Sequence, residues 1–142
     1  IGLVLARDGG ALAKMLPPFQ WGVGGPLGSG RQWMSWIHRD DLIGLIRGIL
    51  EDSRWSGALN ATAPNPVTMR EFAKALGWAL HRPAIAPVPA FVLRVMLGEM
   101  AEMLLTGQRV VPDAALRLGY QFTYPTIREA LLACLAASHA IP

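Results

Sequence analysis

Residues 22–42 read GVGGPLGSGRQWMSWIHRDDL and carry the clearest structural signals in the chain. The glycines predict a loop, and residues 33–37 predict a strand whose side chains alternate between two faces. Asp40 and Asp41 then head a predicted helix to about Glu51, and either carboxylate could cap its N-terminus. We expect a ligand site beside this loop. The alternation places Trp33, Ser35 and Ile37 on one face and Met34, Trp36 and His38 on the other.

The glycine-rich loop does not match a dinucleotide-binding turn. Its glycines fit G-x-G-x-x-G in no register, and the loop leads into a strand, whereas that fingerprint opens a helix. Two interpretations remain open: a long connection without a ligand, or a loop that covers one. Arg31 and Gln32 at its exit favour the second interpretation.

His38 has two possible roles. With Asp40 and Asp41 beside it, the imidazole is a candidate general base. A histidine at a strand-to-helix corner can also serve only to bond the backbone. The two aspartates are adjacent and point in different directions, so they suit a helix cap better than an acid/base pair. We expect no metal site, because the histidines, Cys134 and the carboxylates lack metal-ligand spacing.

The residues before the loop predict a strand and a short helix. Residues 1–6 form a continuous apolar run of the kind found in buried parallel strands. Asp8 is a candidate N-cap for a helix over residues 11–16, which Pro17 and Pro18 are expected to end. Because the chain opens within a strand pattern, we expect an upstream portion of the protein.

The residues after residue 42 predict one more strand and then mainly helices. Apolar spacing predicts a core stripe on the helix that Asp40 and Asp41 begin and on two later helices, each opened by a capping box. The long apolar helix at 89–104 requires cover on more than one side. The stripes are Leu42, Leu45, Ile46 and Ile49; Phe72, Leu76 and Leu80; and Ile127, Leu131, Cys134 and Leu135. The capping boxes are Thr68–Glu71 and Thr126–Glu129. The remaining predicted elements are strands at 57–61 and 108–111, an extended segment at 84–88, and a helix at 113–118 closed by Gly119.

Composition limits the classes of function. The chain has 142 residues, 52% of them hydrophobic and 16% charged, and a thinly spread net charge of +3. Without a basic cluster we expect no nucleic-acid partner, and no apolar stretch is long enough to predict a membrane span. The single cysteine, Cys134, fits a small buried side chain in a reducing compartment, which predicts a cytoplasmic protein.

Residues 28–42 resemble the strand and helix that follow the catalytic residues of extended short-chain dehydrogenases/reductases. A closer resemblance is to the NAD-dependent epimerase-like proteins often labelled nucleoside-diphosphate-sugar epimerases or cell-division inhibitors, which end in a domain of unknown function. The first resemblance continues in LNATAP (59–64), VT (67–68) and EFA (71–73), and the closer one is carried by DGGAL (8–12), WMSW (33–36), PVPAF (87–91) and LGEMA (97–101).

This resemblance implies the C-terminal, substrate-binding part of a Rossmann-type α/β fold, with few strands and a mainly helical C-terminal segment. We divide the chain into residues 1–82, the last sheet elements and the substrate loop, and residues 83–142, the helical segment. The intact protein is implied to bind NAD(P), with NADP favoured, through an upstream half. That half would supply the Gly-rich turn and a Tyr-x-x-x-Lys pair, which are absent here, so this chain should be catalytically incomplete.

The substrate side of the site is predicted from the same resemblance. We expect Arg31, Gln32 and Trp33 to line it, with Trp36 and His38 packing or hydrogen bonding behind them, at the carboxyl edge of the sheet. Nucleotide-sugar enzymes of this superfamily usually carry a diphosphate-binding arginine where this chain has Met34.

The substrate is expected to be a small molecule. The alternative is a non-catalytic interaction or dimerisation module that uses the helix at 89–104. That apolar helix also predicts self-association of the chain.

Overall fold

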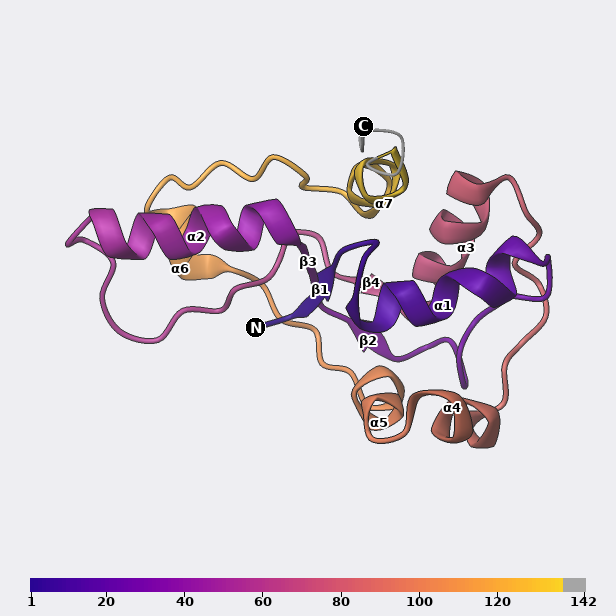
Figure 1. The fold of residues 1–142 in the computed structure, drawn as a ribbon. Coiled ribbons are helices and arrows are strands. Elements are labelled where there is room, and N and C mark those ends of the chain that lie inside the picture. Colours follow the sequence, from indigo (N-terminus) through magenta and orange to yellow (C-terminus); the bar gives the residue numbers. More distant parts are fainter. Residues whose placement is uncertain (137–142) are drawn as a thin grey trace.

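The structure is a computed structural model that describes residues 1–136. In this part, a parallel pair of strands, β1 (Leu3–Leu5) and β3 (Trp36–His38), lies at the centre, beside an antiparallel pair, β2 (Trp33–Met34) and β4 (Val67–Thr68). The helices are α1 (Gly10–Gln20), α2 (Arg39–Glu51), α3 (Met69–Leu80), α4 (Ala90–Leu97), α5 (Met100–Leu105), α6 (Asp113–Arg117) and α7 (Ile127–Ala136). Helices α2 and α6 extend to one side of the strands, and α1, α3, α4 and α5 gather on the other (Figure 1). The α/β class with few strands and several helices is confirmed.

The predicted strand at 33–37 is broken at Ser35. The Ser35 hydroxyl donates to the Gln108 carbonyl (2.6 Å) and accepts from the Val110 amide (2.9 Å), while the Ser35 carbonyl accepts from the Leu3 amide (2.8 Å). These contacts hold Ser35 between β2, which pairs with β4, and β3, which pairs with β1. The single predicted strand is therefore two short strands. Residues 36–38 are all buried, and the predicted alternation is kept, because Met34 and Trp36 lie in the main core and Ile37 lies in a second one.

Helix α1 continues through Pro17 and Pro18, so the predicted end at these residues is wrong. The turn beyond them buries Phe19 in the main core, which offsets the backbone hydrogen bonds that the prolines cannot make. The residue at the N-cap is Gly9, and Asp8 bonds Arg39 instead.

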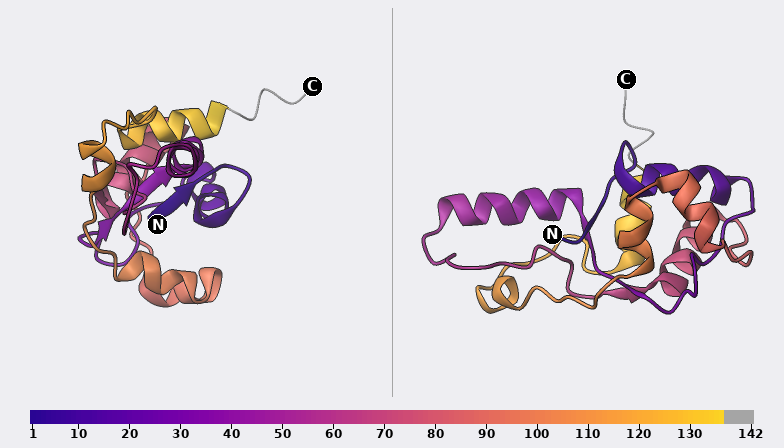
Figure 2. Two further views of the ribbon diagram at one scale, coloured as in Figure 1. Left: turned by 90° about the vertical axis from the view of Figure 1, so that its left-hand side faces the viewer. Right: turned by 90° about the horizontal axis from the view of Figure 1, so that it is seen from below.

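The helix predicted after the loop is α2, but its predicted stripe is only partly buried. Leu45 is fully buried, whereas Ile46 and Ile49 are exposed. Figure 2 shows α2 extending beyond the strands, and α6 and the segment after it, which includes Tyr120 and Phe122, cover one side. Leu45 belongs to a small second core with Ile37, Ala61 and Ala115.

Residues 57–61 and 108–111 form no strand. In the first segment the Ala61 carbonyl accepts from the amide of Gly2, the residue before β1 (2.9 Å), and the second segment is held by Ser35. Single bonds of this kind do not make a ladder. Val88, in the predicted extended segment, forms an isolated parallel bridge with Leu27.

Both capping boxes are confirmed. The Thr68 hydroxyl and the Glu71 carboxylate exchange hydrogen bonds with each other's backbone amides, and Thr126 and Glu129 do the same. The helices that they open, α3 and α7, pack together in the main core. Because α7 returns to α3, residues from both predicted parts share this core. The division at 82/83 stays a prediction, and its last residues, 137–142, lie outside the described part.

The long apolar helix predicted at 89–104 is two helices, α4 and α5. Gly98, with φ 59° and ψ −132°, turns the chain between them, a conformation that favours glycine. Helix α6 is confirmed, and Gly119 follows it with φ 81°. Among the described residues, no helix is both long and apolar enough to cross a membrane.

Candidate functional site

A polar cavity lies at the carboxyl ends of the two parallel strands, the edge that the sequence predicts for a ligand. Its volume is about 610 Å³, within the usual range for small-molecule sites. The loop after β1, the start of α2 and the helix α7 form its walls. The polar side chains that line it are Arg7, Asp8, His38, Arg39, Asp40 and Tyr124.

Arginines hold the walls of this cavity together. Arg39 Nη1 donates to both carboxylate oxygens of Asp8, each at 3.0 Å, which ties α2 to the loop after β1. Arg7 Nη1 donates to the Leu135 carbonyl (2.9 Å) and ties the same loop to α7. No local sequence pattern predicts these long-range pairs.

His38 caps α2. Its Nδ1 accepts a hydrogen bond from the Asp40 amide (3.1 Å), and its ring lies 4.1 Å from the Tyr124 ring, centroid to centroid. Burial lowers the pKa of His38, against the smaller opposing effect of Asp40 and Asp41. The neutral ring therefore has its Nδ1 lone pair engaged by the helix. This is the geometry of the structural role, and the role of general base stays a prediction.

Asp41 is not the helix cap that the sequence suggests. Its side chain is 1% exposed and accepts from the Thr123 amide (2.7 Å) and the Tyr124 amide (2.9 Å). The Tyr120 hydroxyl donates to the Asp41 backbone carbonyl (3.1 Å), and burial raises the pKa of Tyr120. Asp41 thus fixes residues 120–124, and with them Tyr124, at the edge of the polar cavity.

The other predicted site residues lie away from this cavity. Arg31 is exposed at the end of the glycine loop, and the Gln32 amide group donates to the Leu27 carbonyl (2.9 Å) and the Leu104 carbonyl (3.0 Å). Trp33 stacks under Arg109, whose Cζ lies 5.4 Å from the ring centroid. Trp36 is fully buried, and its indole donates to the Asn65 carbonyl (3.0 Å). The structure does not bring these residues together with His38 around one cavity.

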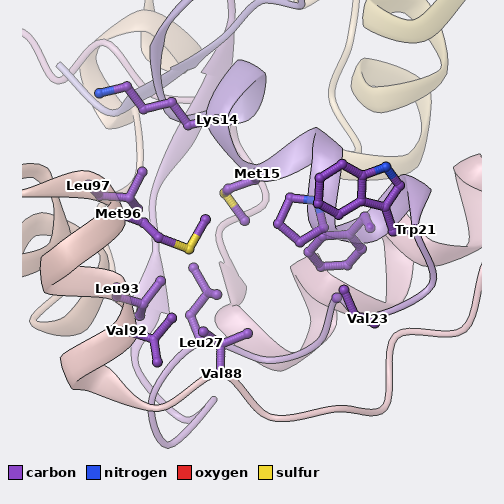
Figure 3. A pocket seen from close by; sticks show the side chains of 13 residues that line it. Lys14, Met15, Trp21, Val23, Leu27, Val88, Val92, Leu93, Met96 and Leu97 are labelled. Atoms are coloured by element: carbon purple, nitrogen blue, oxygen red, sulfur yellow. The ribbon is translucent and has the colours of Figure 1, made fainter.

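A second cavity, which we call the apolar pocket, lies between α1, the glycine loop and α4 (Figure 3). Its volume is about 310 Å³. The sequence pointed to the loop but not to the helices that complete the pocket. Its walls are formed by Lys14, Met15, Pro18, Phe19, Trp21, Val23, Gly24, Leu27, Val88, Val92, Leu93, Met96 and Leu97.

The glycine loop is closely packed against the protein. A Cβ on Gly24 would overlap the Phe19 ring, and one on Gly25 would overlap the Ala86 carbonyl. Backbone bonds from Val23 to Pro18 (3.0 Å) and from Val88 to Pro26 (3.0 Å) hold both ends. These contacts make the first part of the loop a packed element of the protein body.

The described residues contain no group of three or more histidine, cysteine or carboxylate side chains that could hold a metal ion. Cys134 is buried, and burial raises the pKa of its thiol to about 11.

Comparison with known proteins shows the family. A family model described as "Domain of unknown function (DUF1731)" matches residues 88–134. The chain is 51% identical over 135 residues to "Epimerase family protein SDR39U1 homolog, chloroplastic" of Arabidopsis thaliana, and 43% identical over 133 residues to "Epimerase family protein YfhF" of Bacillus subtilis. The chain belongs to this epimerase family. It matches the C-terminal part of the family's members.

Solved structures agree with this assignment. Human epimerase family protein SDR39U1, crystallised with NADPH, has a TM-score of 0.88 and 44% identity over 95% of this chain and 46% of that one. A nucleoside-diphosphate sugar epimerase from Corynebacterium glutamicum has a TM-score of 0.63 and 29% identity over 97% of this chain and 27% of that one. The chain also covers only 39% of the Arabidopsis relative and 44% of the Bacillus relative. It therefore spans less than half the length of these family members.

Proposed function

We propose that this chain is the substrate-binding C-terminal part of an NADPH-dependent oxidoreductase or epimerase-like enzyme of the short-chain dehydrogenase/reductase type. The observation that carries the proposal is the fold match over 95% of the chain to a human relative crystallised with NADPH. The polar cavity supports it, because ligands of open α/β folds bind at the carboxyl ends of the strands. The comparisons lend no support to the alternative of a non-catalytic interaction module.

The cofactor would be held by the Rossmann-type part of the intact protein. This chain has neither a Tyr-x-x-x-Lys pair nor a glycine loop that matches G-x-G-x-x-G. Bound NADPH supplies a hydride to a carbonyl, or its oxidised form takes one from an alcohol. The part of this chain is to bind and orient the small-molecule substrate, and we keep Arg31, Gln32 and Trp33 as proposed contacts.

The compartment is part of the same proposal. A reducing environment such as the cytoplasm fits a chain with one cysteine, because Cys134 has no partner within the chain for a disulfide. Its raised pKa keeps the thiol protonated and unreactive at neutral pH.

Thermal unfolding of the full-length protein tests the proposal. A ligand that binds only the native state raises the melting temperature, so we expect NADPH at about 1 mM to raise it by several degrees. NADH at the same concentration should raise it less. A melting temperature that neither dinucleotide changes would contradict the proposal.

A further inference from the structure

The apolar pocket has walls that can adapt to an occupant. Met15 from α1 and Met96 from α4 point toward one another across it, and Trp21 and Val23 flank its other end (Figure 3). Methionine side chains are flexible and polarisable, so they adjust to ligands of different shape. Trp21 is 77% exposed, which leaves a large aromatic surface at the pocket without protein contacts.

The pocket offers no group that could bind a phosphate. Among the described residues that line it, Lys14 alone carries a charge, and its ammonium group points away from the cavity (Figure 3). Arg31 is not part of the lining. A diphosphate placed here would lose its hydration without gaining the charge-assisted hydrogen bonds that normally replace it.

We infer that this pocket binds the uncharged, mainly hydrocarbon part of a small substrate, and that a nucleotide diphosphate does not compete for this space. The volume of about 310 Å³ admits a group of roughly ten non-hydrogen atoms, at about 30 Å³ for each water-sized group. That the ligand is a substrate rests on the proposed function. The binding of an apolar molecule in the pocket does not depend on the proposed function, because every residue of the lining belongs to this chain.

Binding of a neutral fluorescent probe tests the inference. N-phenyl-1-naphthylamine carries a naphthyl group of about the right size and brightens in apolar surroundings. We expect saturable binding to the full-length protein with a dissociation constant on the order of 10 μM. UDP-glucose at about 1 mM should not displace the probe, because the pocket has no phosphate-binding group.

Variants of α4 locate the binding. Met96 lines the pocket and is 49% exposed, so Met96→Glu and Met96→Trp can introduce a charge or fill the space without opening the core. Each should weaken probe binding about tenfold or more. In Met96→Glu the bound probe would remove water from the carboxylate, and in Met96→Trp the indole would occupy the space of the probe. Val95, the residue directly before Met96, is 84% exposed and outside the lining. Val95→Glu and Val95→Trp are therefore matched controls and should bind within about twofold of the wild type.

Each result decides the inference. Absence of saturable binding to the wild type, equal binding by the Met96 and Val95 variants, or displacement by UDP-glucose would overturn it. The melting-temperature response to NADPH is measured on the same preparations. Probe binding without that response contradicts the proposed function but not the apolar pocket, and the response without probe binding contradicts only the pocket.

Discussion

Asp41 joins two distant parts of the chain with one buried carboxylate. It lies in the first turn of α2, yet both of its oxygens accept amide hydrogen bonds from residues 123 and 124. A buried acceptor of this kind is costly to leave unpaired. Asp41 therefore holds the Tyr124 segment in place rather than serving catalysis or capping.

Replacing Asp41 by asparagine should destabilise the protein. In Asp41→Asn one carboxylate oxygen becomes an NH₂ group that faces an amide donor, and we expect a loss of about 1–3 kcal/mol in the free energy of unfolding. Urea unfolding measures it. The control is Asp40→Asn, at an exposed side chain, which should change stability by less than about 0.5 kcal/mol. Equal effects of the two changes would show that the contacts of Asp41 are dispensable.

His38 should make stability depend on pH. Its pKa is lowered in the folded protein, chiefly by burial, so the unfolded chain binds more protons near and below pH 6.5. The contribution of His38 is therefore present above its unfolded pKa and is lost as the pH falls below it.

His38→Asn isolates this contribution. Asparagine keeps an acceptor for the Asp40 amide and does not titrate. Urea unfolding between pH 7.5 and 5.5 should show a smaller loss of stability for the variant than for the wild type. Identical pH profiles would argue against the lowered pKa.

At the scale of single structural elements, the glycine loop packs closely against the protein and forms one wall of the apolar pocket. Gly24 and Gly25 are buried against Phe19 and the Ala86 carbonyl, and the loop borders the apolar pocket. Glycine is needed here because the backbone approaches its neighbours too closely for a side chain.

A methyl group on this loop should therefore be costly. Gly25→Ala places its Cβ against a backbone carbonyl, which cannot rotate away, and we expect a loss of about 1–3 kcal/mol. At Gly9 the position of a Cβ is open and the backbone is extended, so Gly9→Ala should change stability by less than about 0.5 kcal/mol. Guanidinium unfolding of the two variants compares them, and a tolerant Gly25 would mean that the loop can move away.

Local sequence patterns predicted most elements correctly. The predicted bounds were wrong where contacts between distant residues determine the structure. The capping boxes at Thr68 and Thr126 involve residues three apart, so the sequence contains the whole motif. The break at Ser35 depends on Gln108 and Val110, more than 70 residues away, which no local pattern reveals. The continuation of α1 past its prolines likewise depends on the burial of Phe19.

The candidate site was predictable in outline. The carboxyl edge of the parallel strands was the expected place, and a polar cavity lies there. Its arginine contacts and the role of Asp41 arise from packing between distant segments. The apolar pocket could not be predicted without the positions of α1 and α4. The apolar circumference of residues 89–104 predicted cover on more than one side, but Phe91, Val95 and Met103 are exposed.

At the scale of the whole molecule, the described residues leave apolar helix surface exposed. Ile43, Ile46 and Leu50 on α2 are each exposed by at least 47%. The curated relatives are more than twice as long as the chain, and a solved relative holds NADPH. Both observations fit a chain that acts together with a cofactor-binding part.

Energy transfer between tryptophan and NADPH tests this account most directly. The full-length protein is excited at its tryptophans, which include Trp33 and Trp36, and emission from the dihydronicotinamide is followed during titration. We predict saturable transfer with half-saturation between about 1 μM and 1 mM NADPH, the range in which enzymes commonly bind their substrates. No saturable transfer up to millimolar NADPH would contradict the claim that this chain belongs to an NADPH-dependent enzyme.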